Sequence, residues 1–334
     1  MSPKLNAIFL MNDEVLPLVY GPEERRALED FVVFLAPPLS AASLHDYRGE
    51  LGQVEAIYSG WGVPRLDAAR LDRFPACRAV FHAAGTVRTF VTPELWRRGV
   101  RLTSAAAANA TPVAEYTLAA IIFSLKHAWQ RVFELREHRE SIRTDATMPG
   151  TFGSTVGLLS LSRIGRQVAE RLRALDVRVI AYDPVIDVKV ARALGVELCG
   201  LDQVFQQAEV VSCHMPLLPE TTGVLRASHF SSMKPGATFI NTARGGVVHE
   251  VEMLEVLRRR LDIFAVLDVV QAEPVSAASP LVGRPNVVVT PHIAGSLGPE
   301  CRRMGRFMIE ETRRYLAGEP LQGEVIATQM EFTA

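Results

Sequence analysis

The stretch Thr155-Val-Gly-Leu-Leu-Ser160-Leu-Ser162-Arg-Ile-Gly165 decides the fold, because an apolar strand runs through a short turn into a helix. The helix is predicted over residues 164–175, and a second apolar strand over residues 177–182 ends at Asp183. A strand, a turn, a helix and a second strand closed by a carboxylate form the layout of a dinucleotide-binding βαβ unit. We therefore expect a Rossmann-type parallel sheet built around this stretch.

The turn of this unit departs from the usual G-x-G-x-x-G fingerprint. Only the third glycine, Gly165, is present, and Ser160 and Ser162 stand at the first two positions. The free N–H groups of the helix N-terminus would still face a pyrophosphate, and the Ser162 hydroxyl could donate to a phosphate oxygen. The Asp183 carboxylate would accept hydrogen bonds from a ribose and repel a 2′-phosphate, which favours NAD over NADP. From this stretch alone, a strand–turn–helix that binds nothing stays open as an alternative.

Strand and helix patterns alternate through the rest of the chain, which predicts an α/β protein with parallel sheets. In the first third, strands are predicted over residues 5–11, 31–35, 54–58, 79–82 and 100–103, and helices over residues 23–30, 66–74 and 93–98. One long helix is predicted over residues 113–137, followed by a linker over residues 138–154. In the second half, strands are predicted over residues 210–215, 238–242, 263–269 and 287–290, and helices over residues 201–207, 250–261 and 299–316.

Length and composition favour a globular protein with two domains. The 334 residues include 36 basic and 37 acidic side chains, for a net charge of −1, so nucleic acid and anionic membranes are poor partners. The longest apolar stretch, residues 113–125, is interrupted by Glu115 and falls short of the ~20 residues that span a bilayer. The N-terminus does not resemble a signal peptide, and the four cysteines form no C-x-x-C pair. We expect a cytoplasmic protein with reduced thiols and no metal site.

Three polar side chains follow strands of the second half. Arg244 comes after the strand at residues 238–242, Glu273 after the strand at 263–269, and His292 after the strand at 287–290. In a doubly wound sheet, ligands bind beyond the carboxyl ends of the strands. The three side chains are therefore candidate site residues.

From Phe81 to Leu316 the sequence resembles the D-isomer-specific 2-hydroxyacid dehydrogenases, the group that includes D-3-phosphoglycerate dehydrogenase. The resemblance is carried by an ordered series of motifs rather than by any one of them. They are Ala84-Gly-Thr-Val87, Asn109, Val113-Ala-Glu115, Ile164-Gly165-Arg166, Tyr182-Asp-Pro184, His214-Met-Pro216, Pro219-Glu-Thr221, Met233-Lys-Pro-Gly236 and the segments around Arg244, Glu273 and His292.

The resemblance implies a discontinuous fold. A Rossmann cofactor domain, residues 113–295, is inserted into a flavodoxin-like substrate domain made of residues 1–112 and 296–334. It also implies NAD as the cofactor, no metal, and a homodimer that the helix at residues 113–137 helps to build. The implied reaction moves a hydride between NAD(H) and C2 of a small D-2-hydroxy or 2-keto acid.

The resemblance further implies a role for each matching residue. Arg244 would bind the substrate carboxylate and the C2 oxygen, His292 would exchange the C2 hydroxyl proton, and Glu273 would orient the His292 ring. Asp268 would hold the nicotinamide carboxamide. The backbone N–H groups of Ala84, Gly85, Thr86 and Val87 would receive the substrate carboxylate. The implied cofactor-binding residues are Ser160, Ser162, Arg163, Ile164, Gly165, Asp183, His214, Pro216, Thr221, Thr242, Ala243, Asp268 and His292.

Some questions stay open at the level of sequence. Arg88 and Trp61 favour a 2-keto acid with a second anionic group or a bulky side chain, although Arg88 as a solvated charge and Trp61 as a packing residue are alternatives. A formate or phosphonate dehydrogenase on the same scaffold is one alternative function. A non-catalytic NAD-sensing binder of the same fold is another, and the two serines in the phosphate turn keep it open.

Overall fold

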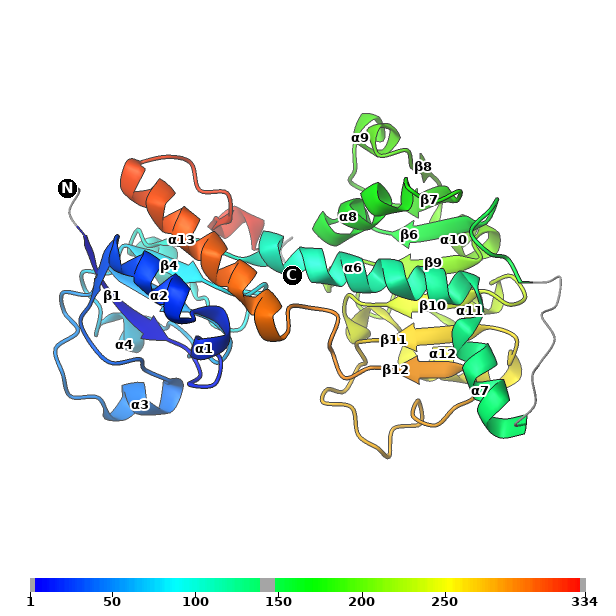
Figure 1. Cartoon of the computed structure of the whole chain (residues 1–334), viewed down its shortest axis with the longest axis horizontal. Coiled ribbons are helices and arrows are strands. Elements are labelled where there is room, and N and C mark those ends of the chain that lie inside the picture. The colour runs from blue at the N-terminus through cyan, green and yellow to red at the C-terminus, as the bar shows by residue number, and fades with distance from the viewer. Residues whose placement is uncertain (1–3, 139–147, 331–334) are drawn as a thin grey trace. The chain divides into compact units, whose positions relative to one another are not determined.

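The computed structural model describes residues 4–138 and 148–330. Contacts between residues divide the chain into two units, one made of Met1–Ala110 with Ser296–Ala334 and the other of Thr111–Gly295. Each unit has its own sheet with helices on both faces (Figure 1). The predicted α/β class with two parallel-sheet domains is confirmed.

The sheet of the first unit contains β1 (Leu5–Leu10), β2 (Val32–Phe34), β3 (Ala56–Ser59), β4 (Ala79–His82), β5 (Arg101–Ser104) and β13 (Glu324–Val325). Its strand order is β13-β5-β4-β3-β1-β2. The five strands from the N-terminal segment are parallel and follow the flavodoxin-like order. The sixth, β13, pairs antiparallel with β5 and had not been predicted.

Alternating side chains of these strands build two apolar layers. Along β1, Leu5, Ala7 and Phe9 point into one layer, whereas Ile8 and Leu10 point into the other. The first layer is covered by α1 (Leu16–Val19), α2 (Pro22–Glu29) and α13 (Cys301–Ala317), and the second by α3 (Ala41–Asp46), α4 (Ala68–Leu71) and α5 (Pro93–Arg97).

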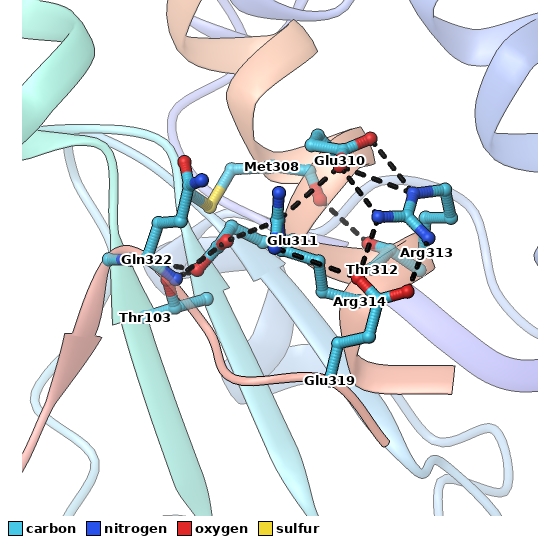
Figure 2. Close-up of polar contacts among 10 residues, drawn as sticks. Thr103, Met308, Glu310, Glu311, Thr312, Arg313, Arg314, Glu319 and Gln322 are labelled. Atoms are coloured by element: carbon cyan, nitrogen blue, oxygen red, sulfur yellow. Dashed lines mark hydrogen bonds and ion pairs between the residues drawn. The ribbon is translucent and has the colours of Figure 1, made fainter. Parts of the chain in front are cut away.

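A buried carboxylate joins α13 to this sheet (Figure 2). The Glu311 side chain is fully buried, and its Oε2 accepts hydrogen bonds from the Thr103 hydroxyl (2.7 Å) and from the Gly323 N–H (2.9 Å). Its Oε1 accepts from the Gln322 N–H at 3.0 Å. Glu311 therefore ties α13 to β5 and to the segment that leads into β13.

The sheet of the second unit contains β6 (Thr155–Leu159), β7 (Arg178–Tyr182), β8 (Glu197–Leu198), β9 (Val210–Cys213), β10 (Thr238–Asn241), β11 (Phe264–Leu267) and β12 (Val287–Val289). All neighbours are parallel, and the order is β12-β11-β10-β9-β6-β7-β8. Numbered from β6, the first six strands have the Rossmann order 3-2-1-4-5-6, and β12 extends the sheet. The order reverses between β6 and β9, which is where such sheets bind their ligands.

Helices cover both faces of this second sheet as well. One face packs against α6 (Ala106–Leu125), α7 (Ala128–His138), α8 (Arg163–Leu172) and α9 (Val188–Ala193), and the other against α10 (Leu201–Gln207), α11 (Ala227–Ser231) and α12 (Glu250–Arg259). In β6, Val156 and Leu158 face the first set, and Leu159 faces the second. A Cβ at Gly157 would collide with Val204 of α10, so the glycine lets this helix lie close to the sheet.

The long helix predicted over residues 113–137 is wrong in two respects. The structure has two helices there, separated at His127, whose backbone is left-handed with φ 48°. The first helix begins at Ala106 and contains Pro112 within it. The strong helix propensity of the alanine run extends the helix upstream of the proline that we took as its start. Residues 139–147 of the predicted linker lie outside the described residues.

Candidate active site

The Asp183 carboxylate stabilises the turn after β6 by accepting hydrogen bonds from it. The N–H of Leu161 (2.7 Å) and the hydroxyl of Ser160 (3.3 Å) donate to its Oδ2, and the N–H groups of Val185 and Ile186 donate to its Oδ1, both at 3.0 Å. Four donors use the acceptor capacity of the carboxylate. A ribose hydroxyl would therefore replace one of them, and the Ser160 hydroxyl is the one that can rotate away.

The backbone places different demands on the first and third positions of the fingerprint. Ser160 adopts the left-handed conformation with φ 77°, which a serine tolerates at a modest cost in free energy. At Gly165 the constraint is steric, because a Cβ there would collide with the carbonyl oxygen of Ser160. Gly165 thus allows α8 to start directly against the turn, with Arg163 and Ile164 in its first turn.

The second serine is engaged with the loop that follows β9. The Ser162 hydroxyl donates to the carbonyl oxygen of His214 at 3.0 Å, so a phosphate contact would require it to turn. The His214 ring is buried, and Nε2 lies 3.1 Å from the Ser212 hydroxyl. Burial lowers the pKa of His214 to about 3, so the ring is neutral. Its Nδ1 has no hydrogen-bond partner among the described residues.

His292 and Glu273 lie in direct contact beyond β12 and β11. The His292 Nδ1 is 2.8 Å from the Glu273 Oε2, and the other carboxylate oxygen accepts from the Val270 N–H at 3.2 Å. Both side chains are partly exposed. The carboxylate is thus held at one oxygen and orients the imidazole with the other, which leaves the His292 Nε2 for a proton transfer.

Arg244 follows β10 in a loop that lies against the loop carrying Glu273. A Cβ at Gly245 would collide with the backbone of Val270, so a glycine is needed for the two loops to approach. The Arg244 Nη1 donates to the Ala243 carbonyl at 2.7 Å. Burial lowers the pKa of Arg244, and the charge of Glu273 opposes this shift. The structure therefore brings Arg244 and Glu273 within electrostatic reach of each other, and Glu273 in turn contacts His292.

Asp268 fixes the loop on which His292 lies. Its Oδ1 accepts from the Thr290 hydroxyl (2.6 Å) and the Ile293 N–H (2.8 Å), and its Oδ2 accepts from the Ala294 N–H (2.9 Å). This clamp accompanies the left-handed backbone of His292, with φ 55°. These three hydrogen bonds were not predicted from the sequence, and the predicted contact of Asp268 with a nicotinamide carboxamide stays a prediction.

Further contacts that the sequence did not reveal stabilise the same loops. The hydroxyl of Tyr116 on α6 lies 2.9 Å from the Thr290 hydroxyl. The Asn241 side chain accepts from the Ala243 N–H and donates to the Arg244 carbonyl, both at 3.0 Å. These partners lie far apart in the sequence or carry no motif of their own.

The remaining predicted cofactor residues of the second unit are held by local contacts. The Thr221 hydroxyl donates to the Pro216 carbonyl at 2.6 Å, and the Thr242 hydroxyl lies 2.9 Å from that of Thr117 on α6.

Among residues 4–138 and 148–330, no group of three or more His, Cys, Asp or Glu side chains is arranged to hold a metal ion. No helix in the same ranges is long and apolar enough to cross a membrane.

In the first unit, the segment predicted to receive the substrate carboxylate follows β4. Ala84 and Val87 are buried, and Gly85 and Thr86 are partly exposed. The Arg88 guanidinium donates to the Met330 carbonyl oxygen at 2.7 Å, which ties this segment to the C-terminal region.

Residues 118–294 match the family described as "D-isomer specific 2-hydroxyacid dehydrogenase, NAD binding domain". The chain belongs to this family. The predicted recognition and NAD as the cofactor are thereby confirmed. Residues 118–294 cover β6 to β12, that is, the complete Rossmann sheet.

Relatives of known identity agree with this membership. D-3-phosphoglycerate dehydrogenase of Mycobacterium leprae is 35% identical over 256 residues, which are 76% of this chain and 48% of the relative. The Archaeoglobus fulgidus protein of the same name is 31% identical over 235 residues, 70% of this chain and 44% of the relative. The chain thus spans about half the length of the curated relatives it matches.

Solved structures show the same fold. A phosphoglycerate oxidoreductase from Rhizobium etli aligns with a TM-score of 0.81 at 22% identity, over 97% of this chain and 99% of the other. The NAD-complexed D-isomer specific 2-hydroxyacid dehydrogenase of Lactobacillus delbrueckii ssp. bulgaricus aligns with a TM-score of 0.76 at 19% identity, over 96% and 100%.

Proposed function

We propose that this protein is an NAD-dependent dehydrogenase that interconverts a small D-2-hydroxy acid and the corresponding 2-keto acid. The observation that carries the proposal is the His292–Glu273 contact of 2.8 Å, beside an Arg244 whose loop packs on the loop of Glu273. A proton-transfer group oriented by a carboxylate, next to a fixed cation, suits the reduction of a carbonyl group.

Each residue of this set has a distinct part in the proposed reaction. Bound nicotinamide supplies the hydride to C2 in reduction and accepts it in oxidation. His292 gives its Nε2 proton to the C2 oxygen in reduction and takes it back in oxidation, while Glu273 keeps the ring oriented through Nδ1. Arg244 remains cationic near neutral pH and binds the carboxylate and the C2 oxygen through its planar fork.

The second unit offers a suitable place for the cofactor. Three observations support a ligand at this edge: the close start of α8 at Gly165, the reversal of strand order, and the buried Nδ1 of His214, which has no partner among the described residues. We propose that the dinucleotide is held by the residues that the family resemblance implied, and that Asp268 also binds it. These are Ser160, Ser162, Arg163, Ile164, Gly165, Asp183, His214, Pro216, Thr221, Thr242, Ala243 and His292.

The substrate carboxylate is proposed to bind the segment formed by Ala84, Gly85, Thr86 and Val87. Among the described residues, no acceptor takes a hydrogen bond from the backbone N–H of Gly85, Thr86 or Val87. Consecutive N–H groups without an internal acceptor suit an anion.

A panel of 2-keto acids tests the proposed function directly. NADH oxidation should be fast with at least one acid of the panel, which would include glyoxylate, pyruvate, phenylpyruvate and phosphohydroxypyruvate. NADH binding without turnover of any of them would overturn the proposed activity and favour the non-catalytic NAD binder instead. Preference for a doubly anionic or bulky acid would support the prediction made from Arg88 and Trp61.

Asp183 is expected to set the choice between the two nicotinamide cofactors. NADH should bind more tightly than NADPH, because the carboxylate repels a 2′-phosphate. Asp183→Ala should weaken NADH binding and reduce the preference, as measured by fluorescence titration with both cofactors. Asp176→Ala removes an exposed carboxylate from the same unit and should change neither affinity. Equal affinities of the wild type for NADH and NADPH would contradict this assignment.

Gly165→Ala is expected to weaken NADH binding by at least ~10-fold and to lower the melting temperature. The added Cβ would collide with the Ser160 carbonyl, so α8 would move away from the turn. Titration with NADH and a thermal melt measure the two effects. At Gly52 a Cβ would meet nothing within 4 Å, so Gly52→Ala should leave both unchanged. A Gly165→Ala protein with normal affinity would show that the turn does not hold the cofactor.

We also propose that the protein forms a homodimer through α6 and α7. Phe123, Val132 and Leu135 are large apolar side chains of these helices that are exposed in the single chain. Leu135→Glu should lower the mass measured by light scattering to that of a monomer, whereas Val251→Glu on α12 should not. A wild-type monomer would contradict the proposal.

We also propose that the protein is located in the cytoplasm. All four cysteines are free, and Cys77, Cys213 and Cys301 are buried. Free thiols suit a reducing compartment, in which disulfides are rare.

A further inference from the structure

Two buried polar side chains end neighbouring strands of the first unit. Ser59 is the last residue of β3 and His82 the last residue of β4, and the two pair in register. Ser59 is fully buried and His82 is 2% exposed. Neither residue belongs to the motifs that carry the family resemblance, and the proposed reaction does not use them.

The imidazole joins Ser59 to the segment after β4. The His82 Nδ1 lies 2.9 Å from the Ser59 hydroxyl, and Nε2 lies 3.1 Å from the carbonyl oxygen of Thr86. A carbonyl oxygen can only accept, so Nε2 carries the proton and Nδ1 of the neutral ring accepts from Ser59. Burial lowers the pKa of His82 to about 3, so the ring stays neutral near pH 7. The two contacts thus fix a single tautomer.

Holding the Thr86 carbonyl also fixes the short backbone segment that leads up to it. Gly85 and Thr86 are partly exposed, and no acceptor in the described part of the chain takes a hydrogen bond from the backbone N–H of either residue. Consecutive N–H groups without an internal acceptor suit an anion, so these two indicate a ligand.

We infer that His82, held by Ser59, is a positioning residue that holds the backbone segment whose N–H groups, those of Gly85 and Thr86, bind the carboxylate of the 2-keto acid. The inference rests on the proposed function. It assigns part of substrate affinity to a residue that touches neither substrate nor cofactor. Because the carboxylate is bound equally in the ground state and the transition state, the loss of His82 should raise KM and leave kcat nearly unchanged.

Two variants of similar size separate this role from simple packing. His82→Leu fills the space without a donor, whereas His82→Gln keeps an amide N–H that can reach the Thr86 carbonyl. With the best acid of the panel, His82→Leu should raise KM about 10-fold, the effect expected for one lost hydrogen bond to a charged group. His82→Gln should recover most of the affinity. The Kd for NADH should stay within about 2-fold in both, because a merely local change leaves cofactor binding intact.

Ser59→Ala gives a milder version of the same test if His82→Leu does not fold. It removes the hydroxyl that fixes the tautomer of His82 without creating a large cavity. KM should rise about 3-fold, as expected for a weakened neutral hydrogen bond. An active wild type together with an unchanged KM in folded His82→Leu, or in Ser59→Ala if His82→Leu does not fold, would overturn the inference alone. So would equal KM values in His82→Leu and His82→Gln. A wild type that reduces no 2-keto acid would overturn the proposed function and this inference with it.

Discussion

Replacing His292 by alanine is expected to lower kcat at least ~100-fold, the lower range for general acid–base catalysis. The variant loses the imidazole that Glu273 orients, since the His292 Nδ1 is bonded to the carboxylate and Nε2 is left for the proposed proton transfer. NADH binding should change by less than about 3-fold, because the phosphate turn and Asp183 are untouched. Stopped-flow kinetics with the best acid of the panel, and a separate NADH titration, give the two values.

Two further variants make this result specific. His45 is an exposed histidine on α3, so His45→Ala should leave kcat unchanged. Glu273→Gln keeps a polar contact to Nδ1 but removes the charge, and it should lower kcat less than His292→Ala does. If His292→Ala turned over at a near-normal rate, the assignment of the proton-transfer group would be wrong. Loss of NADH binding together with kcat would instead indicate that the His292 loop holds the cofactor.

The sheets could be predicted from the sequence because their residues alternate between two apolar layers. In β1 and β6, neighbouring side chains point into different clusters, and the strand predicted over residues 5–11 is observed as β1 at Leu5–Leu10. The short elements could not be predicted in this way. β8 and β13 have two residues each, and a pairing of that length depends on the partner strand rather than on its own pattern.

In the candidate site, too, some features could be predicted from the sequence and others could not. Arg244, Glu273 and His292 could be predicted as candidate residues because each follows a strand, and parallel strands bring their carboxyl ends to one edge. The contacts that fix them were missed. The hydrogen bonds of Thr290, Tyr116 and Asn241 depend on three-dimensional packing. No spacing in the sequence therefore predicts them.

The phosphate turn shows where residue identity alone misleads. From the sequence, Ser160 and Ser162 were both candidates to contact the dinucleotide. The structure engages both hydroxyls within the protein, Ser160 with Asp183 and Ser162 with the His214 carbonyl. A cofactor contact through either serine would thus exchange one hydrogen bond for another. The net gain in affinity would be smaller than a new bond to a phosphate suggests.

Glu311→Ala is expected to produce the largest loss of stability in the first unit, about 3–5 kcal/mol. The carboxylate is fully buried and accepts from Thr103, Gln322 and Gly323, and the substitution would leave all three donors without a partner (Figure 2). β13 should then separate from β5, because the segment that leads into it loses two backbone hydrogen bonds. A thermal melt should show a drop of roughly 10 °C in the transition that reports this unit.

The neighbouring residue on α13 provides the matched control. Glu310 carries the same charge, but its side chain is 45% exposed and pairs with Arg313 near the surface (Figure 2). Exposed ion pairs contribute little to stability, so Glu310→Ala should hardly change the melt. Glu311→Gln distinguishes charge from hydrogen bonding, because the amide keeps one acceptor oxygen but turns an N–H₂ group toward donors. It should lie between the wild type and Glu311→Ala. Equal losses in Glu310→Ala and Glu311→Ala would show that the buried carboxylate does not hold the C-terminal strand in place.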